Sequence, residues 1–172
     1  SLIEALVALA AAATLLAVAV PAWSAASAKA HTAAAKVSLA TTVLDAVRHS
    51  TVTATEVVVC PSTDGQVCVS TTRWEEGWLA FADRDGNRSP GPGETRLRQA
   101  APLEGSIRMR STAGRTRLVF QPHGGNAGSN VTFTLCDGRG SRFASTLVLS
   151  NGGNLRQGTP TPAAALACVH GD

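Results

Sequence analysis

The chain opens with SLIEALVALAAAATLLAVAVPAW (residues 1–23), a nearly unbroken apolar run that holds one carboxylate, Glu4. As a helix, the stretch from Leu2 to Trp23 would be about 33 Å long, enough to cross the hydrocarbon core of a bilayer. An acid inside such a segment costs roughly 2.5–3.5 kcal/mol on insertion, so it needs a partner or a purpose. A secretory signal peptide would have basic residues in front of a shorter apolar core. The run therefore predicts a permanent transmembrane helix, although a signal anchor with an incidental Glu is the simpler alternative.

The helical pattern continues beyond the apolar run. Residues 24–50 are rich in Ala, Lys, Val and Leu and contain neither Gly nor Pro. Spacings of three and four residues place one apolar set on a single helical face: Val37, Ala40, Leu44 and Val47. We expect one helix from Leu2 to about His49, on the order of 70 Å long and bent or loosened at Pro21. Its second half should pack that apolar face on a globular domain.

The first residues carry a family resemblance. Ser1-Leu2-Ile3-Glu4-Ala5, followed by the apolar run to Pro21, resembles the mature N-terminus of type IV pilins and type II secretion pseudopilins. In that family a prepilin peptidase cuts after a Gly and the new N-terminal residue, usually aromatic, is methylated; by this pattern Ser1 is the second mature residue. The resemblance implies that Glu4 recruits the subunit into a growing filament by pairing with a neighbour's N-terminal amine. It also implies an inner-membrane anchor and a periplasmic head, followed by entry into a pilus or pseudopilus and, in a pilus, exposure at the cell surface.

Beyond Ser50 the pattern changes to alternating residues and turn signals. We expect strands at residues 52–60, 67–72, 77–83, 96–99, 106–110, 115–120, 130–136 and 142–150. Residues 157–167, with two prolines and a run of Ala, indicate a surface tail held by Cys168. The expected fold class is α+β: a long N-terminal helix packed on an antiparallel, β-rich head. We divide the chain into a membrane-spanning or filament-core half of the helix (residues 1–24), an amphipathic half (25–50) and the head (51–172).

Four cysteines lie beyond the apolar run: Cys60, Cys68, Cys136 and Cys168. None is in a CxxC pair or beside a His at ligand spacing, so zinc is disfavoured. An even number of cysteines in an exported domain favours disulfides over free thiols. Of the three possible connectivities, Cys60–Cys68 with Cys136–Cys168 is the most economical and is the one we expect. Closing the longer loop would contribute about 3–4 kcal/mol in the chain-entropy model.

The order of motifs in the head is similar to that of FimT/GspH-like minor pilins. The matching elements are Cys60-Pro61 with Cys68, Trp74-Glu75-Glu76-Gly77-Trp78-Leu79-Ala80-Phe81, residues 83–87 with Gly93-Glu94, Leu97-Arg98, Phe133-Thr134-Leu135-Cys136 and Val148-Leu149-Ser150-Asn151-Gly152. The resemblance implies a minor pilin for assembly or initiation of a type IV pilus, with other pilins as partners; some such pilins capture double-stranded DNA for natural transformation. The alternative is a minor pseudopilin of a type II secretion system with a purely structural role. Trp74 and Trp78 are expected in the core or in a subunit interface.

Basic charge is concentrated in the second half of the chain. The formal net charge is +3; residues 1–95 carry a net charge of −3 and residues 96–172 one of +6, with arginine as the only basic residue type in the second part. Alternation in Ile107-Arg108-Met109-Arg110 and Arg115-Thr116-Arg117-Leu118 sends the arginines to one sheet face, and Arg96 and Arg98 behave likewise. Such a face could bind phosphates, or it could be a solvated outer face or form salt bridges to neighbouring subunits.

The resemblance adds a second set of arginines. DNA-binding FimT-type pilins use a Gly-Arg-x-Arg element near the C-terminus, which corresponds here to Gly153-Asn154-Leu155-Arg156. Asn154 replaces the first Arg, which removes one bidentate phosphate partner. Arg139, Arg142 and Arg156 are the remaining candidates for DNA contacts.

Other chemistry has weak support. The histidines, His31, His49, His123 and His170, are scattered, and there is no GxSxG, P-loop or HExxH motif, so we predict neither an enzyme nor a cofactor. Asp83, Asp85, Asn87 and Glu94 occupy positions 1, 3, 5 and 12 of an EF-hand-like loop, which makes them a weak calcium candidate. Arg88 replaces the Gly of position 6 and strands flank the loop, so an ordinary turn is the default.

Overall fold

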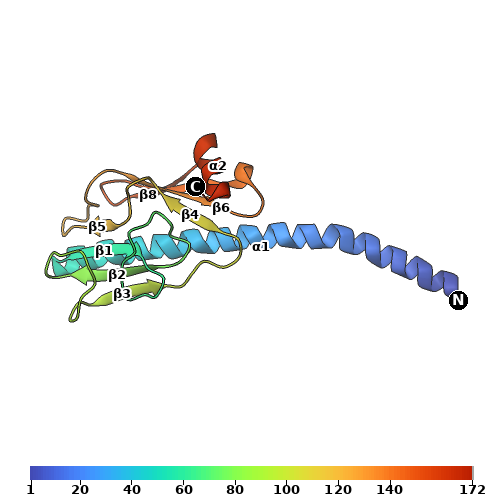
Figure 1. Cartoon of the computed structure of the whole chain (residues 1–172), viewed down its shortest axis with the longest axis horizontal. Helices are drawn as coiled ribbons and strands as arrows, with labels where there is room; N and C mark the ends of the chain where they lie inside the picture. Colours follow the sequence, from blue (N-terminus) through green and yellow to red (C-terminus); the bar gives the residue numbers. More distant parts are fainter. Residues whose placement is uncertain (172) are drawn as a thin grey trace.

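The computed structural model describes residues 1–171 and consists of a long helix attached to a two-sheet head (Figure 1). Helix α1 (Leu2–Thr53) begins with a capping box between Ser1 and Glu4 and ends at Ala54, which adopts a left-handed backbone conformation with φ 53°. Pro21 lies inside the helix, and the stalk bends gently toward its N-terminus (Figure 1). The predicted α+β class, with a long N-terminal helix on antiparallel strands, is confirmed.

Helix α1 extends four residues beyond the expected end at His49, so the strand predicted from Val52 is wrong for its first four residues. The β-branched residues at 51–53 favour strands by propensity. Here Thr51 and Thr53 instead donate their hydroxyl groups to the carbonyl oxygens of Val47 and His49. The helix therefore continues to the edge of the head before the chain turns into the first strand.

The face of α1 that packs on the head differs from the predicted one. Of the predicted stripe, Val37 and Leu44 are 64% and 68% exposed, so the prediction is wrong for these two residues. Ala40 is half-buried and Val47 packs against the core, as expected. The buried face combines apolar and hydroxyl-bearing residues: Thr32, Ala35, Leu39, Thr42, Val43, Ala46 and Ser50. Thr42 is accommodated because its hydroxyl donates to the carbonyl of Ser38 and accepts the indole N–H of Trp78 at 2.9 Å.

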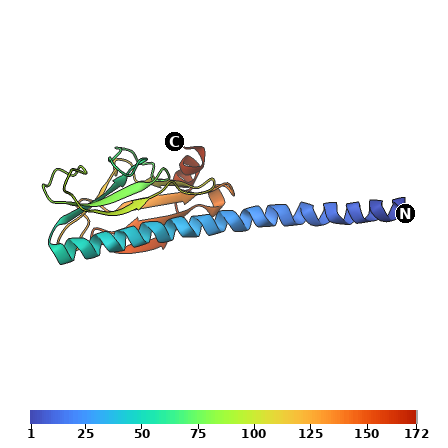
Figure 2. The same cartoon turned by 90° about the horizontal axis from the view of Figure 1, so that it is seen from below.

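Within residues 1–171, two antiparallel four-stranded sheets form the head. The first sheet has the order β3-β2-β1-β5, from β1 (Glu56–Pro61), β2 (Trp78–Asp83), β3 (Arg96–Ala100) and β5 (Leu118–Phe120). The second has the order β4-β6-β7-β8, from β4 (Arg108–Ser111), β6 (Val131–Cys136), β7 (Ser145–Leu149) and β8 (Leu155–Gly158). Figure 2 shows α1 running along the strands of the head, with its N-terminal half projecting beyond them.

The core lies between α1 and the two sheets. Trp74 and Trp78 are fully buried, as expected, and Trp74 meets Phe133 edge-to-face with ring centroids 5.1 Å apart. Such a pair adds about 0.5–1.5 kcal/mol beyond area burial. A second cluster on the outer face of the first sheet includes Val58 and Phe81, with Cys68 packed against it.

Several predicted strands are shorter or absent. Residues 67–72 form no strand. The Cys60–Cys68 disulfide and a hydrogen bond from the Val69 N–H to the Pro61 carbonyl tie this segment to the end of β1, and Val67 is 55% exposed. Residues 115–117 form a loop before β5, and residues 142–144 belong to or follow a 3₁₀ turn, η1 (Ser141–Phe143). At these three segments the alternating sequence pattern is present, but the segments do not join either of the two described sheets.

The C-terminal region is more ordered in secondary structure than the predicted surface tail. It contains β8 and a helix, α2 (Pro162–His170). Thr161 caps the helix by accepting a hydrogen bond from the backbone N–H of Ala164, Pro162 occupies the first turn, and Gly171 ends the helix with φ 85°. These are common start and stop signals. Both expected disulfides are present, and Cys136–Cys168 ties α2 to β6.

Candidate functional site

The N-terminal part of α1 is the first candidate site. Residues 1–26 are all exposed, and the helix is long and apolar enough to cross a membrane. Its large apolar side chains, among them Leu2, Ile3, Leu6, Leu15 and Trp23, contact no part of the described head extensively and are 57–82% exposed. Glu4 lies near the tip, where its carboxylate, 80% exposed, pairs with the Ser1 amine. An exposed hydrocarbon surface of this size needs lipid or other protein around it.

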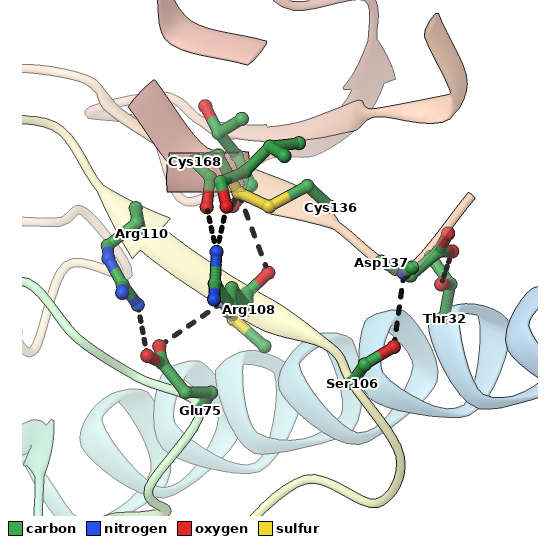
Figure 3. The surroundings of a disulfide bond; sticks show 12 residues. Thr32, Glu75, Ser106, Arg108, Arg110, Cys136, Asp137 and Cys168 are labelled. Carbon is green, nitrogen blue, oxygen red and sulfur yellow. Dashed lines mark hydrogen bonds and ion pairs between the residues drawn. A yellow bond between two sulfur atoms is a disulfide. The ribbon is translucent and has the colours of Figure 1, made fainter. Parts of the chain in front are cut away.

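The arginines of β4 are engaged inside the head (Figure 3). Arg110 is 9% exposed and forms an ion pair with Glu75, whose second carboxylate oxygen accepts the backbone N–H of Met109 at 3.3 Å. Arg108 donates to the carbonyl oxygen of Val169 in the last turn of α2, where helix carbonyls lack intrahelical partners. These two arginines therefore fix the loop at Glu75 and the helix α2 to the second sheet.

Arg115 and Arg117 also contact backbone atoms. Both lie in the loop before β5 instead of on the predicted strand. Arg115 donates to the carbonyl oxygens of Ala127 at 3.1 Å and Ser129 at 2.6 Å. Arg117 donates to the carbonyl oxygen of Arg88 at 3.2 Å. Of the arginines expected on a common sheet face, Arg108 and Arg110 lie on β4 and Arg115 and Arg117 lie in the loop before β5. Each of these four bonds to a different segment of the head.

Asp137 forms a buried ionic cluster that sequence reasoning missed. Its carboxylate, 1% exposed, accepts the hydroxyl of Thr32 at 2.7 Å and two guanidinium N–H groups of Arg139 at 3.0 and 2.7 Å. Burial by itself raises the pKa of Asp137, but the hydrogen bonds from Arg139 and Thr32 outweigh it, so this pKa lies below its ordinary value. The same pairing raises the pKa of Arg139. The cluster links the loop after β6 directly to α1.

Arg142 and Arg156, the other candidates for DNA contacts, lie on different elements. Arg142 is in η1, and its guanidinium stands 4.7 Å from the ring centroid of Phe143. Arg156 is exposed on β8, opposite Val148. From Ser145 to Val148 strand β7 rises about 10 Å, which separates the Arg156 position from η1. Of the three arginines, Arg139 and Arg142 are neighbours, and Arg139 is held by Asp137.

The acidic loop brings three of its four predicted oxygen ligands together. Carboxylate oxygens of Asp83, Asp85 and Glu94 lie within 4.8 Å of one another. The same carboxylates accept backbone N–H groups of their own loop: Asp83 from Gly86 and Arg88, and Glu94 from Arg84 and Gly91. Asn87 donates its side-chain amide to Asp85 at 2.6 Å. The donor set suits a hard cation, while these hydrogen bonds also account for the loop without one.

The fold and the exposed stalk define a pilin-like protein, and comparison with known proteins agrees. A family model described as Type II transport protein GspH matches residues 23–153. The chain belongs to this family, within the superfamily of type IV pilins and type II secretion pseudopilins, and is a minor pilin or pseudopilin. The family is one of structural subunits. The predicted resemblance is therefore confirmed.

Solved structures show the same fold. Two crystal structures of the type IV minor pilin FimU of Pseudomonas aeruginosa strain PAO1, in space groups P21 and P65, match with TM-scores of 0.57 and 0.55. Identity is 13% in both cases; the matches cover 81% and 76% of this chain and 92% and 93% of FimU. At this identity the likeness concerns the fold alone. Among curated proteins, none matches the sequence.

Proposed function

We propose that this protein is a minor pilin that is anchored in the bacterial inner membrane, with its head in the periplasm, and then enters a type IV pilus. The observation that carries the proposal is the exposure of residues 1–26, an apolar helix that the head leaves uncovered. In the membrane, lipid would cover this surface. In a filament, the helices of neighbouring subunits would cover it. Other pilin subunits are therefore the principal partners.

Glu4 is the proposed assembly residue. A carboxylate within an apolar segment is costly unless an opposite charge accompanies it. In the family the opposite charge is the N-terminal amine of a neighbouring subunit, and Glu4, exposed near the helix tip, is placed where such a partner could reach it. The Leu2-Ile3-Glu4 motif supports processing by a prepilin peptidase and N-terminal methylation before assembly.

The alternative is a minor pseudopilin of a type II secretion system. The description of the matching family names type II transport, whereas the solved structures with the same fold are of a type IV minor pilin. The same stalk would serve either filament. DNA capture receives less support from the geometry, because Arg108, Arg110, Arg115 and Arg117 bond to carbonyl or carboxylate groups of the head and Arg139 is paired with Asp137.

The replacement Glu4→Gln tests the assembly role. It keeps the size of the side chain and removes the charge, so the protein should still reach the inner membrane with its head folded. The amount of protein in the sheared filament fraction should fall at least about tenfold, the loss expected when about 1.4 kcal/mol of pairing energy disappears. Immunoblots of membrane and filament fractions measure this ratio. Glu76→Gln, which changes an exposed carboxylate of the head, is the matched control. Normal recovery of the Glu4 variant in filaments would contradict the proposed role.

A further inference from the structure

The end of the head nearest the stalk carries cations around an exposed aromatic ring. The guanidinium groups of Arg139 and Arg142 lie 4.9 and 4.7 Å from the ring centroid of Phe143, whose side chain is 42% exposed. Lys36 lies one helical turn beyond Thr32, which bonds to Asp137, the partner of Arg139, so these two cations are on the same side of α1. Burial lowers the pKa of Lys36, and the positive charge of Arg139 lowers this pKa further. Lys29 is exposed two helical turns before Lys36 on the same side of α1. We call Lys29, Lys36, Arg139, Arg142 and Phe143 the neck cluster.

The neck cluster lies just beyond the end of the apolar segment. Trp23, 77% exposed, ends the apolar run and is a residue type that favours the membrane interface. The hydrogen bond from Thr32 to Asp137 holds the loop of the neck cluster beside α1. The nine residues from Trp23 to Thr32 span about 14 Å of helix, and the polar layer of a bilayer extends about 5–8 Å beyond its hydrocarbon core. With Trp23 at the edge of the hydrocarbon core and α1 upright, the loop stands about 6–9 Å beyond the headgroup layer, so a tilt of α1, commonly about 20°, brings it closer to the headgroups.

The exposed acidic residue at this end of the head, Glu104, lies on another side of α1. Glu104, whose side chain is 83% exposed, is 3.5 Å from the imidazole of His31. At about 100° per residue, His31 and Lys36 are about 140° apart around α1. Asp137 is buried beneath Arg139 and offsets the charge of that residue alone, which leaves Lys29, Lys36 and Arg142 as the unpaired cations of the described flank. The flank that carries the neck cluster is consequently the cationic one.

We propose that the neck cluster binds the anionic phosphate headgroups of the bilayer that holds α1, and so keeps the head against the membrane before the subunit leaves it. A cation near an anionic bilayer surface contributes about 1 kcal/mol. The guanidinium group of Arg142 can match phosphate with paired hydrogen bonds, whereas two N–H groups of Arg139 are already bonded to Asp137. This inference rests on the proposed membrane anchoring and adds a second contact, made by the head itself.

Hydrogen exchange of the full chain in lipid nanodiscs tests the contact. The oxidised protein is inserted into discs of phosphatidylcholine alone and into discs with about one third phosphatidylglycerol, a typical anionic lipid. Backbone amides of residues 137–144 should exchange at least about fivefold more slowly in the anionic discs, since 1 kcal/mol corresponds to a fivefold change in population. The double variant Lys29→Glu with Arg142→Glu should lose this difference. The variant Arg156→Glu should keep the difference in exchange, because β8 begins far from the neck cluster. Gly153, just before β8, lies against Val47, which is about 22 Å farther along α1 than Thr32.

Three results would overturn the inference. Equal exchange of residues 137–144 in both kinds of disc would show that the head makes no lipid contact. Loss of the difference in Arg156→Glu as well would show a response to net charge and not to the neck cluster. Protection of the same loop by a short DNA duplex in phosphatidylcholine discs, without protection by anionic lipid, would assign the surface to nucleic acid. A chain that fails to enter discs at all would instead refute the membrane anchoring, and with it both proposals.

Discussion

The carboxylate of Asp137 accepts hydrogen bonds from Thr32 on α1 and from Arg139 in its own loop, and it is almost completely buried. A buried ion pair is weak evidence for net stabilisation, but removal of one partner leaves an uncompensated charge. Because the pKa of Asp137 lies below its ordinary value, folding favours its ionised form. The side chain therefore makes the attachment of the second sheet to the stalk depend on pH.

The substitution Asp137→Asn should cost about 3 kcal/mol at pH 7, since it leaves Arg139 without its partner. The contribution of the charged carboxylate is complete above the unfolded-state pKa of about 3.9 and is lost as pH falls through the lower native pKa. Denaturant unfolding of both proteins between about pH 7 and pH 2 measures this, and the stability gap should narrow below about pH 4. Asp45→Asn, which breaks the half-exposed pair with Arg98, should cost less than about 1 kcal/mol. A gap for Asp137→Asn that stays constant down to the lowest pH would contradict this account.

At the scale of the element, α1 has two apolar faces with different neighbours. Leu39, Val43 and Ala46 face the sheets, whereas Val37 and Leu44 face outward. Buried side chains of α1 make the junction with the head. The outward residues continue, on the second half of the helix, the exposed apolar surface of residues 1–26. The helix can thus hold the head on one side while it presents apolar surface to other subunits on another.

Two leucines provide a matched test of this arrangement. Leu39→Ala should lower the free energy of unfolding by about 2–5 kcal/mol, because it opens a cavity in the core. Leu44→Ala, the same chemical change at an exposed position, should remain within about 0.5 kcal/mol of the unmodified protein. Thermal and denaturant unfolding measure both. Equal destabilisation by the two substitutions would mean that the helix packs through a different face.

The molecule has two parts, an exposed apolar helix segment and a head with its own core. The most apolar window of α1 has none of its residues buried, whereas the head has a closed core and two disulfides. The anchor segment therefore contributes nothing to the packing of the head. We therefore expect its apolar surface to be covered by lipid or by helices of other subunits.

Removal of residues 1–24 should leave the unfolding of the head unchanged. A chain that starts at Ala25 should unfold within about 4 °C of the full chain in detergent, which corresponds to a difference below about 1 kcal/mol. A chain that starts at Lys36 loses Thr32 and Ala35 and should unfold at a clearly lower temperature. Asp137 then loses the hydrogen bond from Thr32, and the core loses Ala35. Scanning calorimetry compares the three proteins. Strong destabilisation by the shorter truncation would show that the anchor segment supports the head.

The sequence predicted well where the signal is local. The apolar run to Trp23 is contiguous, so it indicates a helix without reference to the rest of the chain. The pairing of Cys60 with Cys68 joins residues close in sequence, and that proximity made it the economical choice. The C-terminal helix shows the opposite error: Thr161, Pro162 and Gly171 carried start and stop signals that the prolines led us to interpret as a tail.

The sequence by itself determined a long apolar stalk, the change from helix to strands near Ser50, and membership of the pilin superfamily, because hydropathy, turn residues and motif order are properties of neighbouring positions. Only the tertiary structure decided which side of α1 meets the head and what each arginine does. Alternation places Arg108 and Arg110 on one face of a strand, but Glu75 and α2, distant in sequence, arrive there only on folding. Likewise, Ala35 is buried and Val37 is exposed, because packing depends on the shape of the partner surface as well as on the hydrophobicity of the helix.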